Sequence, residues 1–323
     1  MNEKYQLPRR ISLSNLDTPV ESCERLSSLF PGGPQVFIKR DDFIGSLVWG
    51  NKLRKLEFVL ADAVGKGADT VITCGGVQSN HCRITAQVAK RLGLDCILVQ
   101  NGEAPKVPAG NHKVNRMLNI EIQYVPSAGD RNARMEEVST DLISAGKKPY
   151  IIPLGASNGI GCLGYIEAMR ELRQQQEKKG IEFDVVVHSS SSGGTQAGLE
   201  LGKRIYGLDR LRIIGISSDT KEEDLKNNIL GCTGPAAELL KVSFKIEPEN
   251  LNVDTGFIGK GYGIATPESI EAEKIFLKNE GIMLDQTYTA KAAAGLIDLI
   301  RKGKLTRGQK VLFWHTGGIL ANI

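Results

Sequence analysis

Short runs of β-branched residues alternate along the chain with amphipathic segments, and this alternation restricts the possible fold more than any other feature. Most of the intervening segments have helical spacing of apolar side chains and are about 10 to 20 residues long. Such alternation predicts right-handed crossover units and hence an α/β fold with mostly parallel strands. The predicted strands are VFIKR (36–40), TVITC (70–74), CILVQ (96–100), EIQYV (121–125), YIIPL (150–154), DVVVHS (184–189), LRIIGIS (211–217) and KVLFWH (310–315).

Length and charge narrow the classes of protein to consider. A chain of 323 residues suggests about two lobes of ordinary size, and no linker or repeat separates them. The 41 basic and 37 acidic residues give a net charge of +4 without a long basic block, which argues against nucleic acid as a partner. Because no apolar run reaches about 18 residues and the N-terminus does not resemble a leader, we expect no membrane association and a cytoplasmic protein.

The cysteines favour neither disulfides nor a metal site. They are scattered, form no C-x-x-C pair and have no histidine at the spacing of a metal motif, so we expect buried free thiols. The four histidines, at positions 81, 112, 188 and 315, also lack the spacing of a metal motif, and we predict no metal site. The cysteines are Cys23, Cys74, Cys82, Cys96, Cys162 and Cys232.

Four loops rich in glycine and serine follow predicted strands: CGGVQSNH (74–81), PLGASNGIG (153–161), HSSSSGGTQAG (188–198) and HTGG (315–318). In open α/β sheets, ligands bind just beyond the carboxyl ends of the strands. These loops are therefore the predicted walls of a binding site.

The loop SSSSGGTQAG is the most specific of the four. Gly193 and Gly194 allow close approach to the backbone, Thr195 could cap the following helix, and exposed amides at a helix N-terminus attract an anion. The pattern is neither a Walker loop nor G-x-G-x-x-G. It predicts a phosphate site, although an ordinary strand-to-helix turn with a serine run accounts for it equally well on pattern alone.

The loop CGGVQSNH places Gln78, Ser79, Asn80 and His81 at the start of a helix. Helix capping explains one or two such residues. Four successive hydrogen-bonding side chains exceed that need and could hold a carboxylate together with backbone amides. His81 taken alone is more simply a structural histidine.

A further helix start, VWGNKLRKLEF (48–58), carries three cations in its first turn. With Asn51 as the predicted cap, the helix begins near Lys52, where the helix dipole costs a cation about 0.3–1 kcal/mol. A partly desolvated lysine beside other cations is more often the neutral amine, which can form an imine with an aldehyde such as pyridoxal phosphate. The cofactor's phosphate would explain Lys55 or Arg54 nearby. The alternative is a solvated helix start whose lysines extend into water.

Together these motifs identify a family resemblance that covers about residues 8–318. The order and spacing of KRDD (39–42), GNK-RKLEF (50–58), QSNH (78–81), GGTQAG (193–198), YG (262–263), LD--YT-KA (284–292) and HTGG (315–318) resemble the D-cysteine desulfhydrase and 1-aminocyclopropane-1-carboxylate deaminase family. The resemblance implies pyridoxal phosphate and the tryptophan synthase β-like fold (fold type II), with two open twisted, mostly parallel sheets flanked by helices and the cofactor in the cleft between lobes. Residues 1–50 and 165–323 would form the large domain and residues 51–164 the small one. Relatives of this kind are commonly homodimers.

The resemblance also implies roles for individual residues. Lys52 would carry the cofactor, Asn80 would contact its 3-hydroxyl oxygen, and Thr316 would lie at its pyridine nitrogen. Lys55 and the loop of Ser192, Gly193, Gly194 and Thr195 would hold the phosphate. Ser79, with neighbouring amides, would bind the substrate carboxylate. Tyr262 and Tyr288 would face the substrate, in a pocket completed by Trp49, Gln78, Asn80 and His81.

The choice of reaction rests on two threonines. The deaminases that this chain resembles carry a glutamate after the tyrosine aligned with Tyr288 and a leucine aligned with Thr316, whereas this chain has Thr289 and Thr316. A hydroxyl at the pyridine nitrogen draws less charge into the ring than a carboxylate does, which suits prompt loss of a β-substituent. We therefore predict a carbon-sulfur lyase that converts D-cysteine to pyruvate, hydrogen sulfide and ammonia. Lys52, Ser79 or a tyrosine could take the Cα proton, and we favour Lys52.

Three departures from the family pattern leave other activities open. Trp49 and Ser191 stand where relatives usually have glycine, which Ser191 tolerates only if its φ is negative, and the chain ends soon after HTGG. The alternatives are 1-aminocyclopropane-1-carboxylate deaminase, L-cysteate sulfo-lyase and a pyridoxal-phosphate-binding protein without turnover. A nucleotide-binding α/β module fits least, because the glycine fingerprint is missing.

Overall fold

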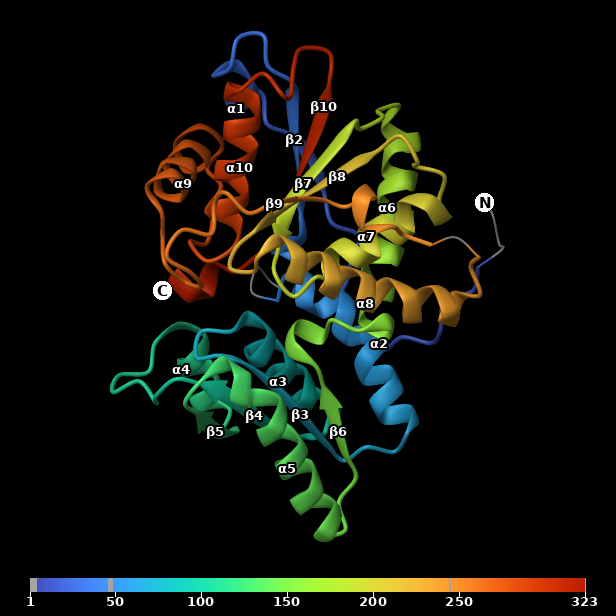
Figure 1. Cartoon of the computed structure of the whole chain (residues 1–323), viewed down its shortest axis with the longest axis vertical. Helices are drawn as coiled ribbons and strands as arrows, with labels where there is room; N and C mark the ends of the chain where they lie inside the picture. Colours follow the sequence, from blue (N-terminus) through green and yellow to red (C-terminus); the bar gives the residue numbers. More distant parts are fainter. Residues whose placement is uncertain (1–4, 46–48, 244, 323) are drawn as a thin grey trace.

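The computed structural model describes residues 5–45, 49–243 and 245–322. It contains two separate sheets with helices packed against their faces, arranged one above the other in Figure 1. All eight predicted strands are present: β2 (Gln35–Arg40), β3 (Thr70–Gly76), β4 (Asp95–Asn101), β5 (Glu121–Val125), β6 (Pro149–Ile152), β7 (Val185–Ser190), β8 (Arg212–Ser217) and β10 (Lys310–His315). Two strands of three residues, β1 (Val20–Ser22) and β9 (Asn252–Asp254), were not predicted, because so few residues carry no recognisable pattern.

The larger sheet has the strand order β1-β2-β10-β7-β8-β9, and every pair except β1–β2 is parallel. Alternate residues of its strands enter two different cores. Val311 and Phe313 pack with α9 (Pro267–Glu280) and α10 (Thr289–Arg301) on one face. Leu312 and Trp314 pack with α6 (Gly159–Lys179) and α7 (Gly194–Ile205) on the other. Helices α1 (Glu24–Ser28) and α8 (Glu222–Leu240) also belong to the part of the molecule around the larger sheet (Figure 1).

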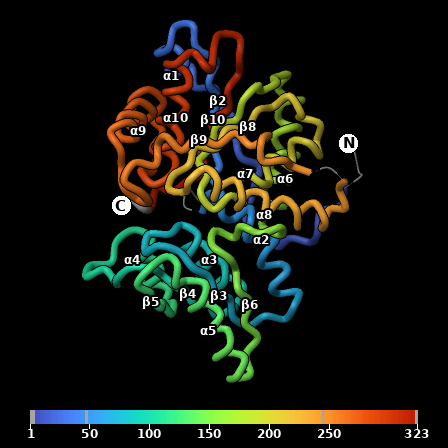
Figure 2. The backbone as a smooth tube through the Cα atoms, viewed as in Figure 1, coloured from blue at the N-terminus to red at the C-terminus, as the bar shows by residue number. Residues whose placement is uncertain are grey.

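The smaller sheet has the order β5-β4-β3-β6 and is entirely parallel. One face packs against α5 (Arg131–Ser144) and the other against α2 (Asn51–Gly65) and α3 (Asn80–Leu92), while α4 (Gly110–Met117) follows β4. All four strands lie within residues 51–164 and all strands of the larger sheet lie outside that range. The backbone trace in Figure 2 follows this segment through the lower part of the molecule. The domain boundaries themselves stay a prediction.

Five short 3₁₀ helices connect these elements: η1 (Asp41–Phe43), η2 (Ala128–Asp130), η3 (Leu154–Ala156), η4 (Pro248–Asn250) and η5 (Ile319–Asn322). All six cysteines are free and buried, as predicted. In the part of the chain that the structure describes, no helix is both long enough and apolar enough to cross a membrane.

Two predicted helix caps are wrong by one or two residues. Helix α2 begins at Asn51, and its N-cap is Gly50 with a φ of 58°. A Cβ on Gly50 would lie 2.5 Å from the Thr316 carbonyl oxygen. Helix α7 begins at Gly194 and its N-cap is Gly193, so Thr195 does not cap it. Instead the Asn51 amide donates to the Thr195 hydroxyl at 3.4 Å, so that these two side chains link the two helix starts.

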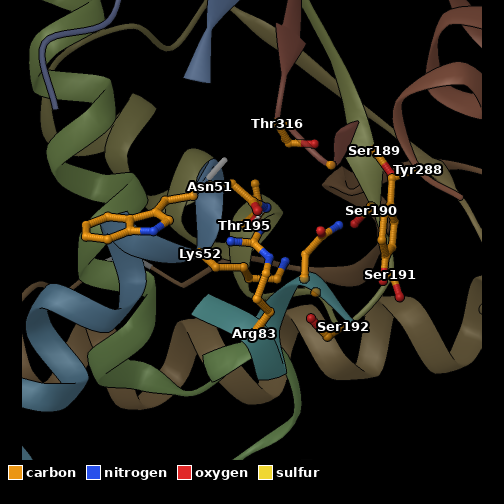
Figure 3. Close-up of a pocket in the computed structure, with 15 residues that line it drawn as sticks. Asn51, Lys52, Arg83, Ser189, Ser190, Ser191, Ser192, Thr195, Tyr288 and Thr316 are labelled. Atoms are coloured by element: carbon orange, nitrogen blue, oxygen red, sulfur yellow. Dashed lines mark hydrogen bonds between the residues drawn. The ribbon is translucent and has the colours of Figure 1, made fainter. Parts of the chain in front are cut away.

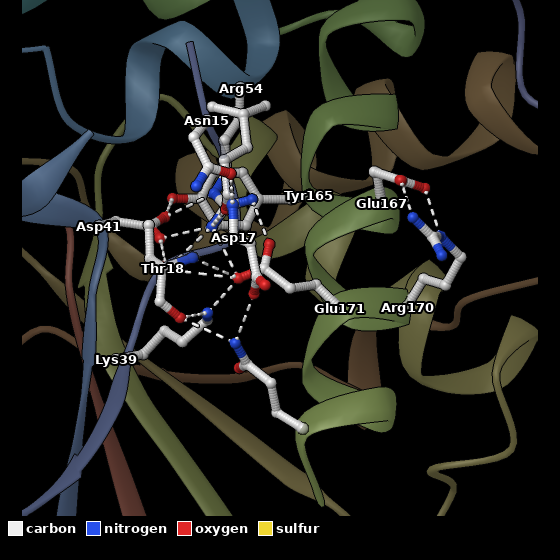
Figure 4. A network of polar contacts seen from close by, with 12 residues as sticks. Asn15, Asp17, Thr18, Lys39, Asp41, Arg54, Tyr165, Glu167, Arg170 and Glu171 are labelled. Atoms are coloured by element: carbon white, nitrogen blue, oxygen red, sulfur yellow. Dashed lines mark hydrogen bonds and ion pairs between the residues drawn. The ribbon is translucent and has the colours of Figure 1, made fainter. Parts of the chain in front are cut away.

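Arg54, one of the three cations in the first turn of α2, belongs to a buried ion network away from the glycine and serine loops (Figure 4). Its guanidinium donates to Asp41 at 2.7 and 2.9 Å and to Glu171 at 2.8 Å. Lys39 also pairs with Glu171, and the Tyr165 hydroxyl donates to Asp41 at 2.7 Å. Burial alone would raise the pKa of Asp41, but the charge of Arg54 and its hydrogen bonds hold that pKa down at about 2. Arg54 is therefore explained by packing of α2 against α6, not by a ligand.

Candidate active site

The loops that follow β7 and β10 meet the starts of α2 and α3 and enclose a first cavity (Figure 3). Eight of the predicted site residues line it. They are Trp49, Lys52, Asn80, Ser192, Gly193, Thr195, Tyr288 and Thr316. Asn51, Arg83, Ser189, Ser190, Ser191, Gly317 and Gly318 complete its wall.

A second cavity of about 160 Å³ adjoins the first, and Lys52, Ser191, Ser192 and Tyr288 line both. Three further predicted residues, Ser79, His81 and Tyr262, line only the second cavity. The rest of its wall is Gly75, Gly76, Asn101, Ala128, Arg131, Leu154, Gly155 and Asp219. Of the predicted residues, Gln78, Lys55 and Gly194 line neither cavity.

Lys52 lies where the two cavities meet, as the second residue of α2. Burial and the charge of Lys55 lower its pKa from 10.5 to about 7, against the opposite influence of Asp285 and Asp219. Near neutral pH about half of the side chains are therefore neutral amines. A neutral amine at the junction of two cavities is able to attack a carbonyl group.

Lys55 lies behind the loop that follows β7 instead of lining the cavity. It is fully buried, and its Nζ donates to the Gly155 carbonyl at 3.0 Å and to the Ser157 hydroxyl at 2.9 Å. Ser157 in turn hydrogen-bonds the Ser192 hydroxyl at 2.8 Å and accepts from the Gly194 amide at 3.3 Å. Lys55 thus places a positive charge directly beneath the start of α7.

The loop itself has the features that a phosphate requires. Gly193 has a φ of 81°, and a Cβ on Gly194 would lie 2.7 Å from the Lys55 Nζ. The first amides of α7 have no acceptor within the helix and carry its positive dipole end. Ser191 is not among the residues with a positive φ, so its side chain is tolerated at this point of the loop.

Unpartnered hydroxyls extend this fit beyond the phosphate loop. The Ser189 and Ser190 hydroxyls, at the end of β7, are buried, have no hydrogen-bond partner within the described structure and line the first cavity (Figure 3). Buried polar groups without partners are rare in native proteins. Together with the amides of α7 and the Lys52 amine, they suit a polar aldehyde that carries a phosphate group, as pyridoxal phosphate does.

The start of α3 is fixed by a residue that the sequence did not reveal. Ser79 is the N-cap of α3 and accepts from the Cys82 amide at 3.2 Å. Asn80 accepts from the Asn111 side chain at 3.0 Å, and Asn111 also accepts from Arg83 at 2.6 Å. Asn111 therefore orients Asn80 toward the first cavity. Only the polar side chain of Asn111 hints at this role, because its partners lie about 30 residues away.

Of the two other side chains of this motif, Gln78 lies outside both cavities, whereas His81 lines the second. Gln78 binds the start of α4, donating to the Ala109 carbonyl at 3.1 Å and accepting from the Asn111 amide at 2.9 Å. His81 is buried against Thr73, with its Nε2 2.7 Å from the hydroxyl. Burial, with the charge of Lys52 next, lowers the pKa of His81 well below its usual range, so His81 is a neutral residue in the wall of the second cavity.

Tyr262 and Tyr288 form an edge-to-face pair in the second cavity. Their ring centroids are 5.8 Å apart and their hydroxyls are joined by a hydrogen bond of 2.9 Å. Burial, with the neighbouring Tyr262 next, raises the pKa of Tyr288 well above its usual range. The buried Lys291 holds the loop that carries Tyr262, donating to the carbonyls of Ile258 at 2.7 Å and Gly261 at 2.9 Å. Both tyrosines are neutral hydroxyl groups at physiological pH.

Only one of the two threonines that guided the sequence interpretation lines the first cavity. Thr316 does so, whereas Thr289 is buried and donates to the Asp285 carboxylate at 2.7 Å. Asp285 accepts as well from the backbone amides of Thr287, Tyr288 and Thr289 at 2.9–3.1 Å. The proposed contact of Thr316 with the cofactor stays a prediction, and Thr289 supports the loop of Asp285 instead of lining this cavity. None of the described residues that line the first cavity carries a carboxylate.

Comparison with known proteins gives a consistent result. The family model described as pyridoxal-phosphate dependent enzyme matches residues 11–317. The protein named "Putative 1-aminocyclopropane-1-carboxylate deaminase" in Pyrococcus horikoshii is 42% identical over 313 residues, which cover 96% of this chain and 92% of that protein. Its namesake in Pyrococcus abyssi is 40% identical over 312 residues, with the same coverage.

Solved structures agree with the sequence comparison. A crystal structure described as an ACC deaminase homologue has a TM-score of 0.87 and 38% identity, covering 98% of this chain and 94% of that one. An aspartate racemase that depends on pyridoxal 5′-phosphate has a TM-score of 0.68 at 17% identity, covering 94% of this chain and 90% of that one. The second likeness concerns the fold alone, which is the predicted fold type II.

Proposed function

This chain belongs to the pyridoxal-phosphate dependent enzyme family, and on that basis we propose that it is a lyase that removes the β-substituent of D-cysteine, yielding pyruvate, hydrogen sulfide and ammonia. When bound, pyridoxal phosphate withdraws electrons from the α-carbon of an attached amino acid. The residues described above determine which reaction the substrate then undergoes.

We assign the binding roles by position. Lys52 would hold the cofactor through its neutral amine, and the amides of Gly193 and Thr195 would bind the phosphate above the Lys55 charge. The Gly194 amide donates to Ser157, so Gly194 would serve by leaving room above Lys55. Asn80, oriented by Asn111, and Thr316 line the first cavity and would contact the cofactor there. The first amides of α3, next to Ser79, bind the substrate carboxylate because they have no acceptor within the helix.

Lys52 is the best-matched acceptor for the Cα proton. A general base works best when its pKa lies near the working pH, and the pKa of Lys52 is about 7. Ser79 already accepts from the Cys82 amide, and the raised pKa of Tyr288 keeps that hydroxyl protonated. In the proposed reaction Lys52 takes the proton, and the C–S bond breaks with its electron pair leaving on sulfur. The remaining enamine is hydrolysed to pyruvate and ammonia.

One observation carries the choice of β-elimination. The described wall of the first cavity contains the Thr316 hydroxyl and no carboxylate. The nearby Asp285 carboxylate accepts hydrogen bonds from backbone amides and from the Thr289 hydroxyl. A hydroxyl stabilises positive charge on a pyridine ring less than a carboxylate does, which favours rapid loss of a leaving group over a long-lived carbanion.

A second candidate is the opening of the ring of 1-aminocyclopropane-1-carboxylate. The names of the two Pyrococcus relatives support it. It requires the same lysine and the same carboxylate site, so the residues of the first cavity do not distinguish the two substrates by themselves.

The test is to offer D-cysteine, L-cysteine and 1-aminocyclopropane-1-carboxylate to the purified holoprotein and to assay sulfide, pyruvate, 2-oxobutanoate and ammonia. We expect sulfide and pyruvate in equal amounts from D-cysteine. Production of 2-oxobutanoate without sulfide would replace our proposal by the second candidate. A bound cofactor with no ammonia from any substrate would indicate a binding protein. Lys52→Ala should lose the cofactor absorbance, while Lys66→Ala, at an exposed position just after the same helix, should keep it.

A further inference from the structure

Arg131 lines the second cavity and has no assigned role. It is the first residue of α5 and is only partly exposed. Its Nε donates to the Ala128 carbonyl at 2.9 Å and its Nη1 donates to the Asn101 side-chain oxygen at 3.4 Å. Because Asn101 ends β4 and also lines this cavity, the guanidinium is fixed at the cavity wall, with donor groups to spare.

Within the described ranges, no carboxylate of this chain forms an ion pair with Arg131, although Arg134 on the same helix pairs with Glu137. The adjacent Asp130 is turned toward Ser127, accepting from its amide at 2.9 Å and from its hydroxyl at 2.8 Å. A cation in the first turn of a helix also opposes the helix dipole, at a cost of about 0.3–1 kcal/mol. The fold therefore holds Arg131 at an unfavourable position without a counter-ion.

The positive charge of Arg131 also affects buried thiols behind the wall of the second cavity. Burial raises the pKa of the Cys74 and Cys82 thiols, and the charge of Arg131 partly offsets that rise at both. Cys74 lies in β3 and Cys82 in the first turn of α3, just beyond Ser79. Arg131 and the amino end of α3 thus make one side of the cavity electropositive.

The carboxylate in the described wall of the second cavity belongs to Asp219. Asp219, in the loop after β8, accepts from the Ser218 and Thr220 hydroxyls at 3.2 and 3.0 Å. Its charge contributes to the raised pKa of Tyr288, and it forms no ion pair with Arg131 among the described residues. An anion that enters the cavity is therefore attracted to Arg131 and away from the tyrosine pair.

Building on the proposed β-elimination, we propose that Arg131 binds a negatively charged β-substituent, so that the site proposed for D-cysteine also accepts amino acids whose leaving group is an anionic acid, such as a sulfate or sulfonate. The α-carboxylate occupies the first amides of α3, so Arg131 is left for the side chain. A guanidinium is suited to this because its fork of donors matches the oxygens of a sulfate or carboxylate. During elimination the C–O or C–S bond breaks, its electron pair leaves with the substituent, and Arg131 holds the departing anion.

The test compares serine O-sulfate with β-chloroalanine, which undergo the same elimination with a charged and an uncharged substituent. Both enantiomers of each are assayed with the holoprotein by release of pyruvate. We expect Arg131→Gln to lower kcat/KM for serine O-sulfate at least tenfold and to change kcat/KM for β-chloroalanine less than threefold. Arg131→Lys should restore part of the loss, because the charge returns without the fork. The matched control is Arg134→Gln, one turn along α5, whose partners are Gln123 and Glu137.

Two outcomes would overturn the inference. An equal loss on both substrates would assign Arg131 to the α-carboxylate or to folding, and no loss on either substrate would leave it without a role in selection. If the wild-type holoprotein turns over neither substrate, the proposed function fails, and binding then tests Arg131 separately. In that case cofactor absorbance is titrated with aspartate and with asparagine. The inference stands only if aspartate binds more tightly and Arg131→Gln removes the difference.

Discussion

Replacing Lys52 by methionine should stabilise the cofactor-free protein while abolishing its chemistry. The folded protein lowers the pKa of this lysine from 10.5 to about 7, mainly because the side chain is desolvated. Folding therefore costs free energy whenever the unfolded chain carries a proton on Lys52 that the folded chain holds less tightly. Methionine has a similar unbranched side chain and no charge, so the variant avoids this cost.

The size of the effect follows from the two pKa values. Each pKa unit corresponds to about 1.4 kcal/mol, so the difference between 10.5 and about 7 sets a ceiling of about 5 kcal/mol. Lys52 is partly exposed and water screens it, which reduces the expected gain to about 2 kcal/mol. The cost is absent above pH 10.5, grows as the pH falls toward 7 and is constant below that value. The advantage of Lys52→Met should therefore be largest at or below pH 7 and should shrink as the pH rises.

Urea unfolding of the cofactor-free proteins, followed by circular dichroism at pH 6.5, 8.0 and 9.5, measures this difference. Lys66→Met is the matched control, because Lys66 lies just after α2, is exposed and makes surface contacts with Asp62 and the Tyr150 ring. We expect the control to change the free energy of unfolding by less than about 0.5 kcal/mol at every pH. A Lys52→Met advantage that stays constant from pH 6.5 to 9.5 would refute a lowered pKa and, with it, the neutral amine.

Three further predictions follow from the contacts of the site and its supports. Asp41→Asn should cost about 3–5 kcal/mol in urea unfolding because it removes one of the two buried carboxylates that balance Arg54 and Lys39, whereas Asp62→Asn should cost less than about 1 kcal/mol. Gly194→Ala should weaken cofactor retention during dialysis at least tenfold, since the new Cβ occupies the space above the buried lysine, and full retention would contradict this. Lys291→Met should lower kcat/KM at least tenfold with the cofactor still bound, because the loop of Tyr262 loses its anchor, and an unchanged kcat/KM would show that the anchor is dispensable.

The strands could be predicted because each is a local pattern. In a parallel sheet covered on both faces, a strand reads as a continuous β-branched run, as VVV does at 185–187. The three-residue strands β1 and β9 carry no such run, and their pairing depends on neighbours far along the chain. Helix starts were less certain for the same reason. Asn51 has the chemistry of a cap, but its side chain is drawn to Thr195, which lies 144 residues away.

The candidate site was predictable where glycine and polar residues cluster in sequence. The loops at 78–81 and 191–195 could be found because they concentrate hydrogen-bonding groups at helix starts. The orienting roles of Asn111, Ser157 and Lys291 could not, because these residues act through partners far along the chain, although Ser157 and Lys291 lie within stretches that the sequence singled out. Arg131 has the same character. Its position at the cavity wall depends on the packing of α5 against the smaller sheet, which no local pattern encodes.

The three cations at the start of α2 lie within about one helical turn, yet two of them have structural roles and only Lys52 is placed to react. Successive residues of an α-helix point about 100° apart, so Lys52, Arg54 and Lys55 face three different surroundings. Arg54 meets two carboxylates and Lys55 meets a carbonyl and a hydroxyl. Lys52 faces the cavities, where the described structure gives its amine no carboxylate partner and Lys55 repels its charge. The two buried cations thus anchor the helix against α6 and the phosphate loop. They also hold Lys52 where water reaches its side chain only in part. The lowered pKa of Lys52 is therefore a consequence of the contacts that Arg54 and Lys55 make.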